Sequence, residues 1–437
     1  MRRLVALHHL LFRFRGGFLV RPVLIALGLG AFGAVLSAVE EAVPAVGRLV
    51  PRVLFPSSSD PQVAQVILAC VATSTMTIVS IVFAILLMTL TLASMQFSPR
   101  IIVSFIQDRV TQQTLGMFLG TFAYCLAALP ATRSLPYPFV PVATVFGAMI
   151  LALASVGWLL FFIHHVSQAI SVNHIVDRIA WETEAVIDEM MPSPRRAGSR
   201  EEEPVPAEAP GVPVLNRASG YIRYVDTDRL VALATATGRS IRVLRRVGHF
   251  VPAGVPLVLV SGPHPAARTG DDVLAAFEFG PSRTMEQDVE FGVLQIIDIA
   301  LRAVSPAVND PSTAISCVDQ LSRILIRFAS RELPPPVLRG RASAASVSVL
   351  WPDFLRLVDV AFEQIRLFSK ADLAVNLRMM RALTDIVSTL PDAGWRRALA
   401  ARGRRIVAGC EPRFEEHELV ELRERLASLE RAAAEFR

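Results

Sequence analysis

Acidic, basic and amide side chains gather in "RTMEQDVEFGVLQIIDIALRAVSPAVNDP" (283–311), where we look first for a polar site. Apolar residues recur there at helical spacing until Ser305-Pro306, and Asp310 and Pro311 are suited to cap and begin a second helix. One interpretation is a pocket for a small ligand or ion, and the simpler one is a solvated helix face beside a capped turn. The candidate residues are Asp288, Gln295, Asp298, Arg302, Asn309 and Asp310.

The residue patterns that assemble a catalytic centre are missing from this sequence. It has no phosphate-binding P-loop, no GxSxG turn, no HExxH motif and no glycine-rich dinucleotide turn. The cysteines, Cys70, Cys125, Cys317 and Cys410, lie far apart and form no CxxC or zinc spacing. We therefore expect no enzyme, no cofactor and no metal site.

Hydroxyl residues recur near one face of the long apolar stretch from Gln62 to Met95. Such side chains can line a water-filled path, or can bond to their own helix and let neighbouring helices approach closely. The second to fourth apolar spans carry no acidic or basic side chain at hydrocarbon depth, which disfavours proton relays and ion-coupled transporters. A passive pore remains open, and its candidate lining residues are Thr73, Thr77, Ser80 and Thr91.

These hydroxyl residues need a membrane domain to position them, and the composition indicates one. Of the 437 residues 52% are hydrophobic, and the mean hydropathy is +0.46. Mostly apolar windows of roughly 18 residues or more, long enough to cross a bilayer, occur at about 19–40, 64–93 and 139–163, with a shorter one at 115–130. We predict an α-helical integral membrane domain with four transmembrane helices over residues 1–165.

The placement of arginine orients this domain. Every basic residue except Lys370 is arginine, and arginines precede the first span, lie between spans two and three, and follow span four. By the positive-inside rule both termini are then cytoplasmic. Arginine at membrane edges also explains the net charge of +5, so we expect the lipid bilayer as a partner and no nucleic acid.

The rest of the chain predicts a cytoplasmic α+β region. A connecting helix over 166–190 precedes a stretch at 191–212 whose Pro- and Glu-rich composition is typical of a disordered linker. Short β-like runs predict a small β-sandwich-like module over 213–262, and helical patterns predict a helical domain over 263–437.

The β module contains a recognisable turn pattern. "RRVGHFVPAGVPLVLV" (245–260) reads G-x-x-V-x-x-G-x-x-L from Gly248 through Gly254 to Leu257, and so resembles half of a biotinyl/lipoyl-type sandwich. Carrier domains of that type hold their cofactor on a lysine, and Lys370 lies far outside the module, which excludes a carrier role. The two glycines are predicted to occupy turns with positive φ.

The end of the second span predicts a corner at the membrane surface. Pro99 in "MQFSPR" (95–100) disfavours helical geometry at Ser98, so the long span should stop there. A structural corner is the simpler interpretation. If span two lines a pore, Gln96, Phe97 and Arg100 are candidates for a gate or charge filter at its inner mouth.

The last helix carries a short coiled-coil pattern. It favours either self-association or packing against the preceding helices. The pattern alternates in steps of three and four through Leu419, Leu422, Leu426, Leu429, Ala433 and Phe436.

Two stretches go beyond composition. "TLASMQFSPR" (91–100) and "RTMEQDVEFGVLQIIDIALRAVSPAVNDPSTAISCVDQL" (283–321) resemble the bacterial family of predicted membrane proteins called domain of unknown function 2254. The order of spans, β module and helical segment is also similar. The resemblance implies a bacterial inner-membrane location and supplies no activity, cofactor or catalytic residue.

The sequence therefore leaves two functional hypotheses, of which we favour the first. The first is a homo-oligomeric channel for ions or small solutes, in which span two lines the path and the cytoplasmic domains form a vestibule or gate. The second is a membrane-anchored sensor or scaffold whose soluble region binds a ligand or a protein.

Overall fold

The computed structural model divides the chain into two compact units, Met1–Ser171 and Val172–Arg437, each of which is described by itself. Its described residues are 20–50, 60–96, 109–133, 139–169, 171–195, 211–261, 267–340 and 344–435. Most of the predicted linker at 191–212 lies outside them.

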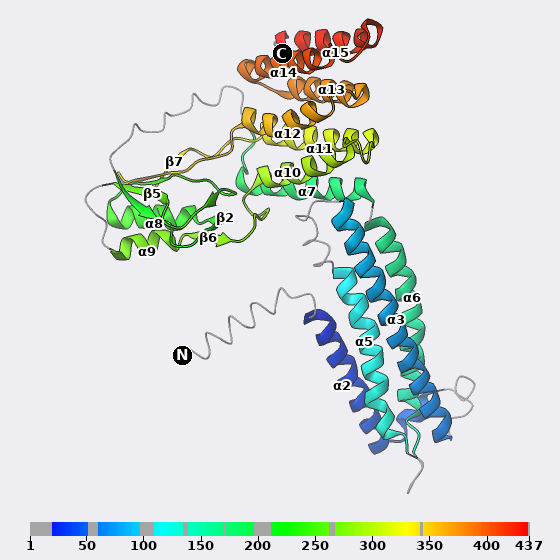
Figure 1. Ribbon diagram of the computed structural model, residues 1–437. Coiled ribbons are helices and arrows are strands. Elements are labelled where there is room, and N and C mark those ends of the chain that lie inside the picture. The colour runs from blue at the N-terminus through cyan, green and yellow to red at the C-terminus, as the bar shows by residue number, and fades with distance from the viewer. Residues whose placement is uncertain are drawn as a thin grey trace. The chain divides into compact units, whose positions relative to one another are not determined.

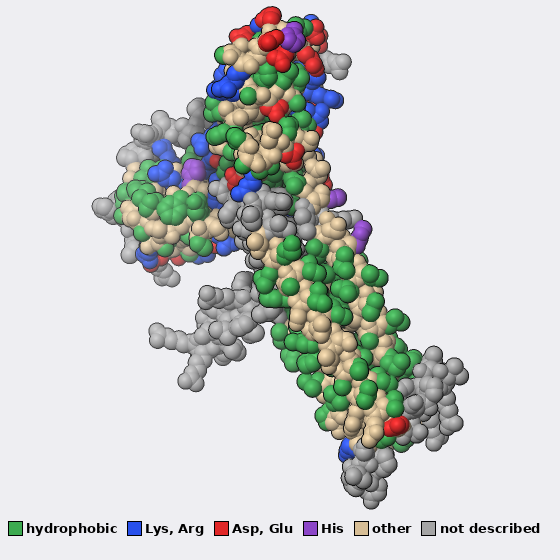
Figure 2. Space-filling model, turned by 45° about the vertical axis from the view of Figure 1, so that its right-hand side comes forward, with side chains coloured by type: hydrophobic (Ala, Val, Ile, Leu, Met, Phe, Trp, Pro, Cys, Tyr) green, Lys and Arg blue, Asp and Glu red, His purple; other side chains and the backbone are tan. Residues whose placement is uncertain are grey.

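The first unit is a bundle of apolar helices (Figure 1). Its described part holds 4 helices long and apolar enough to cross a membrane, as the sequence predicted. Figure 2 shows hydrophobic side chains over the visible surface of this unit, as expected of a lipid-facing bundle. The helices are α2 (Val20–Ala42), α3 (Pro61–Gln96), α5 (Arg109–Ala128) and α6 (Val142–Ala169), with short 3-10 turns at Val46–Leu49 and Leu129–Ala131.

Glycines allow α2 and α5 to pack closely along their length. A Cβ on Gly116 would lie 2.7 Å from Ile25 Cδ1, and one on Gly120 would lie 2.5 Å from Leu29 Cδ1. A Cβ on Gly33 of α2 would likewise lie 2.9 Å from the backbone carbonyl oxygen of Tyr124. Small residues four apart are a common solution for helices in lipid, where close van der Waals contact replaces the hydrophobic effect.

The β module of the second unit consists of two sheets around one apolar core (Figure 1). One sheet has the order β1-β5-β3-β8-β7 and the other β4-β2-β6, with β3 and β8 pairing in parallel. The strands are β1 (Gly211–Leu215), β2 (Gly220–Val225), β3 (Ile241–Val243), β4 (Phe250–Val251), β5 (Pro256–Ser261), β6 (Phe277–Gly280), β7 (Val337–Arg339) and β8 (Ser346–Ser348), and the module includes helices α8 (Thr227–Thr237) and α9 (Ala267–Leu274).

The sheets extend beyond the predicted module boundary at residue 262. Strands β6, β7 and β8 come from later in the chain, and β7 and β8 are short strands in the Pro- and Arg-rich gap at 331–348. Runs of 3 residues are too short to show an alternating pattern. The positive φ predicted for the module's turn glycines is confirmed, at 85° for Gly248 and 82° for Gly254.

The remaining helices stack in successive layers, as Figure 1 shows. Helix α7 packs on α10 and α11, α12 on α10, α13 on α11, and α14 and α15 close the stack. This order, in which each layer contacts its neighbours, is typical of helical repeat proteins. The helices are α7 (Val172–Met190), α10 (Val289–Ala303), α11 (Pro311–Ala329), α12 (Phe354–Phe368), α13 (Leu373–Thr389), α14 (Ala393–Cys410) and α15 (Glu416–Ala434).

Aspartate caps begin five of these helices. The side chains of Asp288, Asp310, Asp353, Asp372 and Asp392 each accept a backbone N–H from the first turn of α10, α11, α12, α13 and α14 respectively. The predicted cap at Asp310 and first helical residue at Pro311 are thereby confirmed.

The leucine pattern of α15 packs within the chain. Leu419, Leu422 and Leu429 are at most 2% exposed, and a Cβ on Gly403 of α14 would lie 2.5 Å from Leu429 Cδ2. Helix α15 contacts α13 and α14, which is the packing alternative that the sequence left open. Phe436 lies outside the described residues. The heptads therefore give no support to self-association.

Candidate functional site

The hydroxyl residues predicted to line a pore lie on the outer face of α3. Thr73, Thr77, Ser80 and Thr91 are all exposed in the single chain. Thr77, Ser80 and Thr91 donate hydrogen bonds of 3.0, 3.2 and 2.8 Å to the carbonyl oxygens four residues earlier. The opposite face, with Leu68 and Val82, packs into the bundle. The described residues of one chain therefore enclose no path along these hydroxyls.

The predicted gate residues lie at the limit of the described structure. Gln96 is the last residue of α3, and Phe97 and Arg100 lie outside the described residues. Their role as a corner or gate stays a prediction.

The predicted polar cluster is spread along α10. Asp288 caps its first turn, whereas the Asp310 N–H donates to Ala303 O at its other end, which a 15-residue helix places about 22 Å away. Asp298 and Arg302 are half-buried along the helix, and Gln295 is buried. These residues therefore do not surround one pocket.

The turn before α11 is a helix start of defined geometry. Asn309 has a positive φ of 49°, and Asp310 accepts hydrogen bonds from the Thr313 hydroxyl at 2.6 Å and the Thr313 N–H at 3.1 Å. The hydroxyl bond first, and then the backbone bond, lowers the pKa of the Asp310 carboxyl below its usual value.

Asp288 is held by several hydrogen bonds. Arg283 donates to both of its carboxylate oxygens, at 2.7 and 2.8 Å, and the Phe291 N–H donates to it at 3.1 Å. The β3–β4 turn passes so close that a Cβ on Gly248 would lie 2.2 Å from Asp288 Oδ2. This acid thus fixes the start of α10 against the β module.

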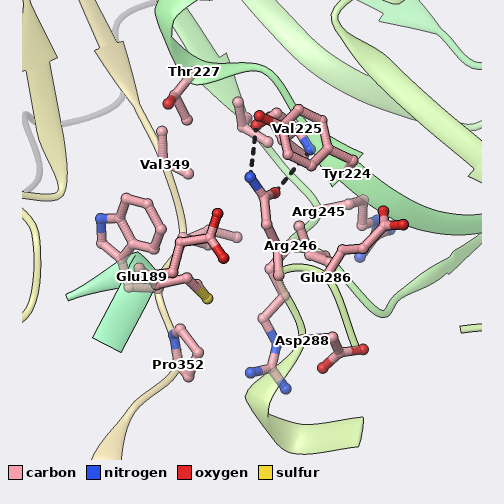
Figure 3. Close-up of a pocket in the computed structure, with 16 residues that line it drawn as sticks. Glu189, Tyr224, Val225, Thr227, Arg245, Arg246, Glu286, Asp288, Val349 and Pro352 are labelled. Carbon is pink, nitrogen blue, oxygen red and sulfur yellow. Dashed lines mark hydrogen bonds between the residues drawn. The ribbon is translucent and has the colours of Figure 1, made fainter. Parts of the chain in front are cut away.

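Beside Asp288 lies a cavity of about 260 Å³, many times the roughly 10–15 Å³ that admits one water. The end of α7, the β module, the segment before α10 and the segment before α12 all contribute to it. In Figure 3 Glu189, Val349 and Pro352 lie on one side of the cavity, and Tyr224, Arg245 and Glu286 on the other. Its lining residues are Glu189, Met190, Tyr224, Val225, Thr227, Val243, Arg245, Arg246, Val247, Glu286, Gln287, Asp288, Val349, Leu350, Trp351 and Pro352.

Some polar groups of the cavity are committed to protein partners. Arg246 forms an ion pair with Glu290 and donates to His249 Nε2 at 3.0 Å. Burial first, and then the positive charge of Arg246, lowers the pKa of His249 below its usual value. The Gln287 side chain accepts a hydrogen bond from the Val225 N–H at 3.0 Å and donates one to the Val225 carbonyl at 3.4 Å.

Other charged groups of the cavity have no such partner. Glu189, Glu286 and Arg245 are exposed and form no hydrogen bond or ion pair with the described residues. A cavity with an apolar wall and a few uncommitted charges is the usual form of a small-molecule site. Across the described part of the chain, no group of three or more His, Cys, Asp or Glu is placed to hold a metal ion.

Of the residues that line this cavity, only Asp288 was among the site residues predicted from the sequence. The others are scattered between residues 189 and 352, and "RRVGHF" was interpreted only as a turn. The sequence offered two hints of this cavity: two adjacent arginines in a turn, and Trp351 after a short strand. Neither hint shows which distant segment these residues contact.

The membrane unit holds a buried acid that sequence analysis also missed. Glu40 is 2% exposed and accepts hydrogen bonds from the Ala143 N–H at 2.8 Å, the Thr144 N–H at 3.1 Å and the Thr144 hydroxyl at 3.1 Å. These N–H groups belong to the first turn of α6, which Glu40 therefore caps from α2. The contact is structural and joins the first and last spans.

Comparisons with known proteins identify one family and uncharacterized relatives. The family described as "Predicted membrane protein (DUF2254)" matches residues 15–385. An uncharacterized protein of Mycobacterium bovis is 32% identical over 397 residues, which cover 89% of this chain and 75% of the relative. An uncharacterized protein of Mycobacterium tuberculosis has the same identity and coverage. No solved structure is significantly similar to the chain.

Proposed function

The chain belongs to the DUF2254 family of predicted membrane proteins, and from its geometry we propose that it is a membrane-anchored sensor of a small molecule. The observation that carries this proposal is the cavity beside Asp288, in which three charged side chains have no hydrogen-bond or ion-pair partner among the described residues. The arginine distribution supports a cytoplasmic position for this cavity, with both termini on the same side of a bacterial inner membrane.

Ligand binding in the cavity can affect the rest of the chain because the end of α7 lines the cavity. Glu189 and Met190 belong to the last turn of this helix, which begins at Val172, shortly after α6 ends at Ala169. A ligand that contacts Glu189 therefore acts on the helix that continues the chain from the fourth span. A ligand that favours one position of α7 shifts the population of that position.

Arginines of α11, together with Arg331 just after it, hold α7 in place against the helical stack. Arg323 contacts Asp177 at 2.8 Å and Glu184 at 2.6 Å, and Arg327 and Arg331 contact Asp188 at 2.8 and 2.7 Å. In the proposed mechanism a ligand at the end of α7 consequently acts on α7 and α11 together.

The test is ligand binding by the full chain in an uncharged mild detergent. A small-molecule panel covering cationic, anionic and neutral compounds is screened by melting temperature and by tryptophan fluorescence, to which Trp351 of the cavity contributes. A ligand at 100 times its Kd stabilises the folded state by about 2.7 kcal/mol, which corresponds to a rise of roughly 5–10 °C for a unit of this size. If every charge class leaves both signals unchanged in a monodisperse sample, the sensor proposal fails.

A homo-oligomeric channel is the second candidate, and the outward hydroxyl face of α3 favours it. Thr73, Thr77 and Ser80 are exposed in one chain, so several copies could bring these faces around a common axis. Exposed hydroxyls bonded to their own helix are equally compatible with lipid. A particle of several chains in detergent, together with ion flux in liposomes, would support the channel. A monomer without flux would exclude it.

A further inference from the structure

Resting on the proposed ligand-binding role, we infer that the cavity beside Glu189 binds a small organic cation, an aliphatic amine. Some charged side chains of the cavity are neutralised by protein partners, whereas others face the cavity with no partner among the residues that the structure describes. The apolar part of the cavity wall then favours an aliphatic molecule as the carrier of the positive group.

The committed charges cancel within the protein. Arg246 is neutralised by Glu290, both side chains being only 11% and 12% exposed, and Asp288 is neutralised by Arg283. These pairs leave no strong field for a ligand, because each charge has its opposite within contact distance. Only the remaining groups can select the ligand's charge.

The uncommitted groups sum to a negative charge. Glu189 and Glu286 contribute two carboxylates, and Arg245 contributes one guanidinium. Glu189 also stands in the last turn of α7, where the helix dipole adds partial negative charge. The positive N-terminus of α8 does not offset this, since Asp226 caps it. A cation is thus favoured over an anion.

The positions of these two carboxylates and one guanidinium indicate where the cationic end of the ligand binds. In Figure 3 Glu189 extends into the cavity from one side, and Arg245 and Glu286 lie together on the other. Val243, Val349 and Leu350 supply apolar wall. An ammonium on an aliphatic stem can therefore pair with Glu189 while the stem contacts apolar side chains.

Two kinds of amine share this chemistry. A polyamine would place a second ammonium at Glu286, and a basic amino acid would place its α-ammonium at Glu286 and its carboxylate at Arg245. Arg245 distinguishes them, because only the amino acid carries an anionic group for it.

The experiment uses the full chain in uncharged detergent and measures the Kd of putrescine, spermidine, lysine, norleucine and glutamate by calorimetry. We expect the amines to bind and norleucine and glutamate to bind at least tenfold more weakly. Glu189→Gln should weaken amine binding roughly 10-fold or more, since a charge-assisted contact is lost. Glu182→Gln, on the same helix but outside the cavity, should leave it unchanged.

The outcomes are separable. Arg245→Gln should weaken lysine and not putrescine if the ligand is an amino acid, and it should weaken neither if the ligand is a polyamine. Tighter binding of glutamate than of any amine, or amine binding unaffected by Glu189→Gln, overturns the inference while leaving a ligand-binding protein. Failure of all compounds overturns the inference. If the broader panel of every charge class also fails, the sensor proposal falls with it.

Discussion

Gly248 and Gly254 allow the cost of backbone strain to be separated from the cost of crowding Asp288. Both glycines have positive φ, at 85° and 82°. A Cβ at position 254 would meet nothing within 4 Å, whereas one at 248 would lie 2.2 Å from Asp288 Oδ2 and 2.7 Å from Arg283 Nη2. The same substitution at the two sites therefore differs in one physical effect.

The magnitudes follow from the contacts. An alanine in this left-handed region costs about 1–2 kcal/mol of unfolding free energy, which is the whole effect expected for Gly254→Ala. In Gly248→Ala, Asp288 must also move. It then loses its N-cap bond, worth about 1 kcal/mol, and its bond to partly buried Arg283, worth about 1–3 kcal/mol. The expected total is about 3–6 kcal/mol.

The assay is the melting temperature of each variant in the full chain. At about 2–4 °C per kcal/mol for domains of comparable size, Gly254→Ala should lower it by several degrees and Gly248→Ala by at least twice as much. In an Asp288→Ala background Arg283 also loses the carboxylate that holds it near Gly248 and can move away, so the extra cost at 248 should disappear, leaving only strain. Equal effects at the two glycines, or an unchanged cost at 248 without the Asp288 carboxylate, would refute the reasoning.

Three further predictions concern single side chains. Glu40→Gln should lower the melting temperature of the membrane unit by removing a charge from the start of α6, worth about 1–2 kcal/mol, whereas Glu41→Gln, in an exposed ion pair, should change it by less than about 1 kcal/mol. The pKa of Asp310 is lowered in the folded state. The resulting stability is present above the unfolded pKa of about 3.9 and is lost as pH falls through the folded pKa. In thermal melts from pH 7 to 3, Asp310→Asn should therefore lose less stability than the parent. If α3 lines a channel, Thr77→Leu should reduce liposome flux while the detergent particle keeps its size; a particle that falls apart instead would identify this face as packing surface.

The features that the sequence predicted correctly are those with a local signal. Four apolar windows became four helices, because a bilayer-length run of apolar residues leaves the backbone few alternatives. Asp310 and Pro311 begin α11 as expected, since capping depends on neighbours three residues away. The turn glycines were predictable for the same reason.

The features that the sequence did not reveal depend on distant partners. Strands β7 and β8 have too few residues for an alternating pattern and join the sheet through β3, far earlier in the chain. Glu40 is an acid near a span end, which is ordinary in sequence, and only the fold shows that it caps α6. The cavity likewise combines segments from residue 189 to residue 352.

Two arginines of α11 and Arg331 just after it determine how a ligand in the cavity would affect the rest of the unit. Arg323, Arg327 and Arg331 repeat every four residues and meet Asp177, Glu184 and Asp188 along one side of α7. Each partly exposed pair contributes at most about 1 kcal/mol, but the buried face of α7, including Thr183 against Gly292 of α10, adds close packing. Bending α7 would break several of these contacts at once. The compact unit also begins at Val172, the first residue of α7. A ligand at Glu189 would therefore move α7 with the helical stack as one body.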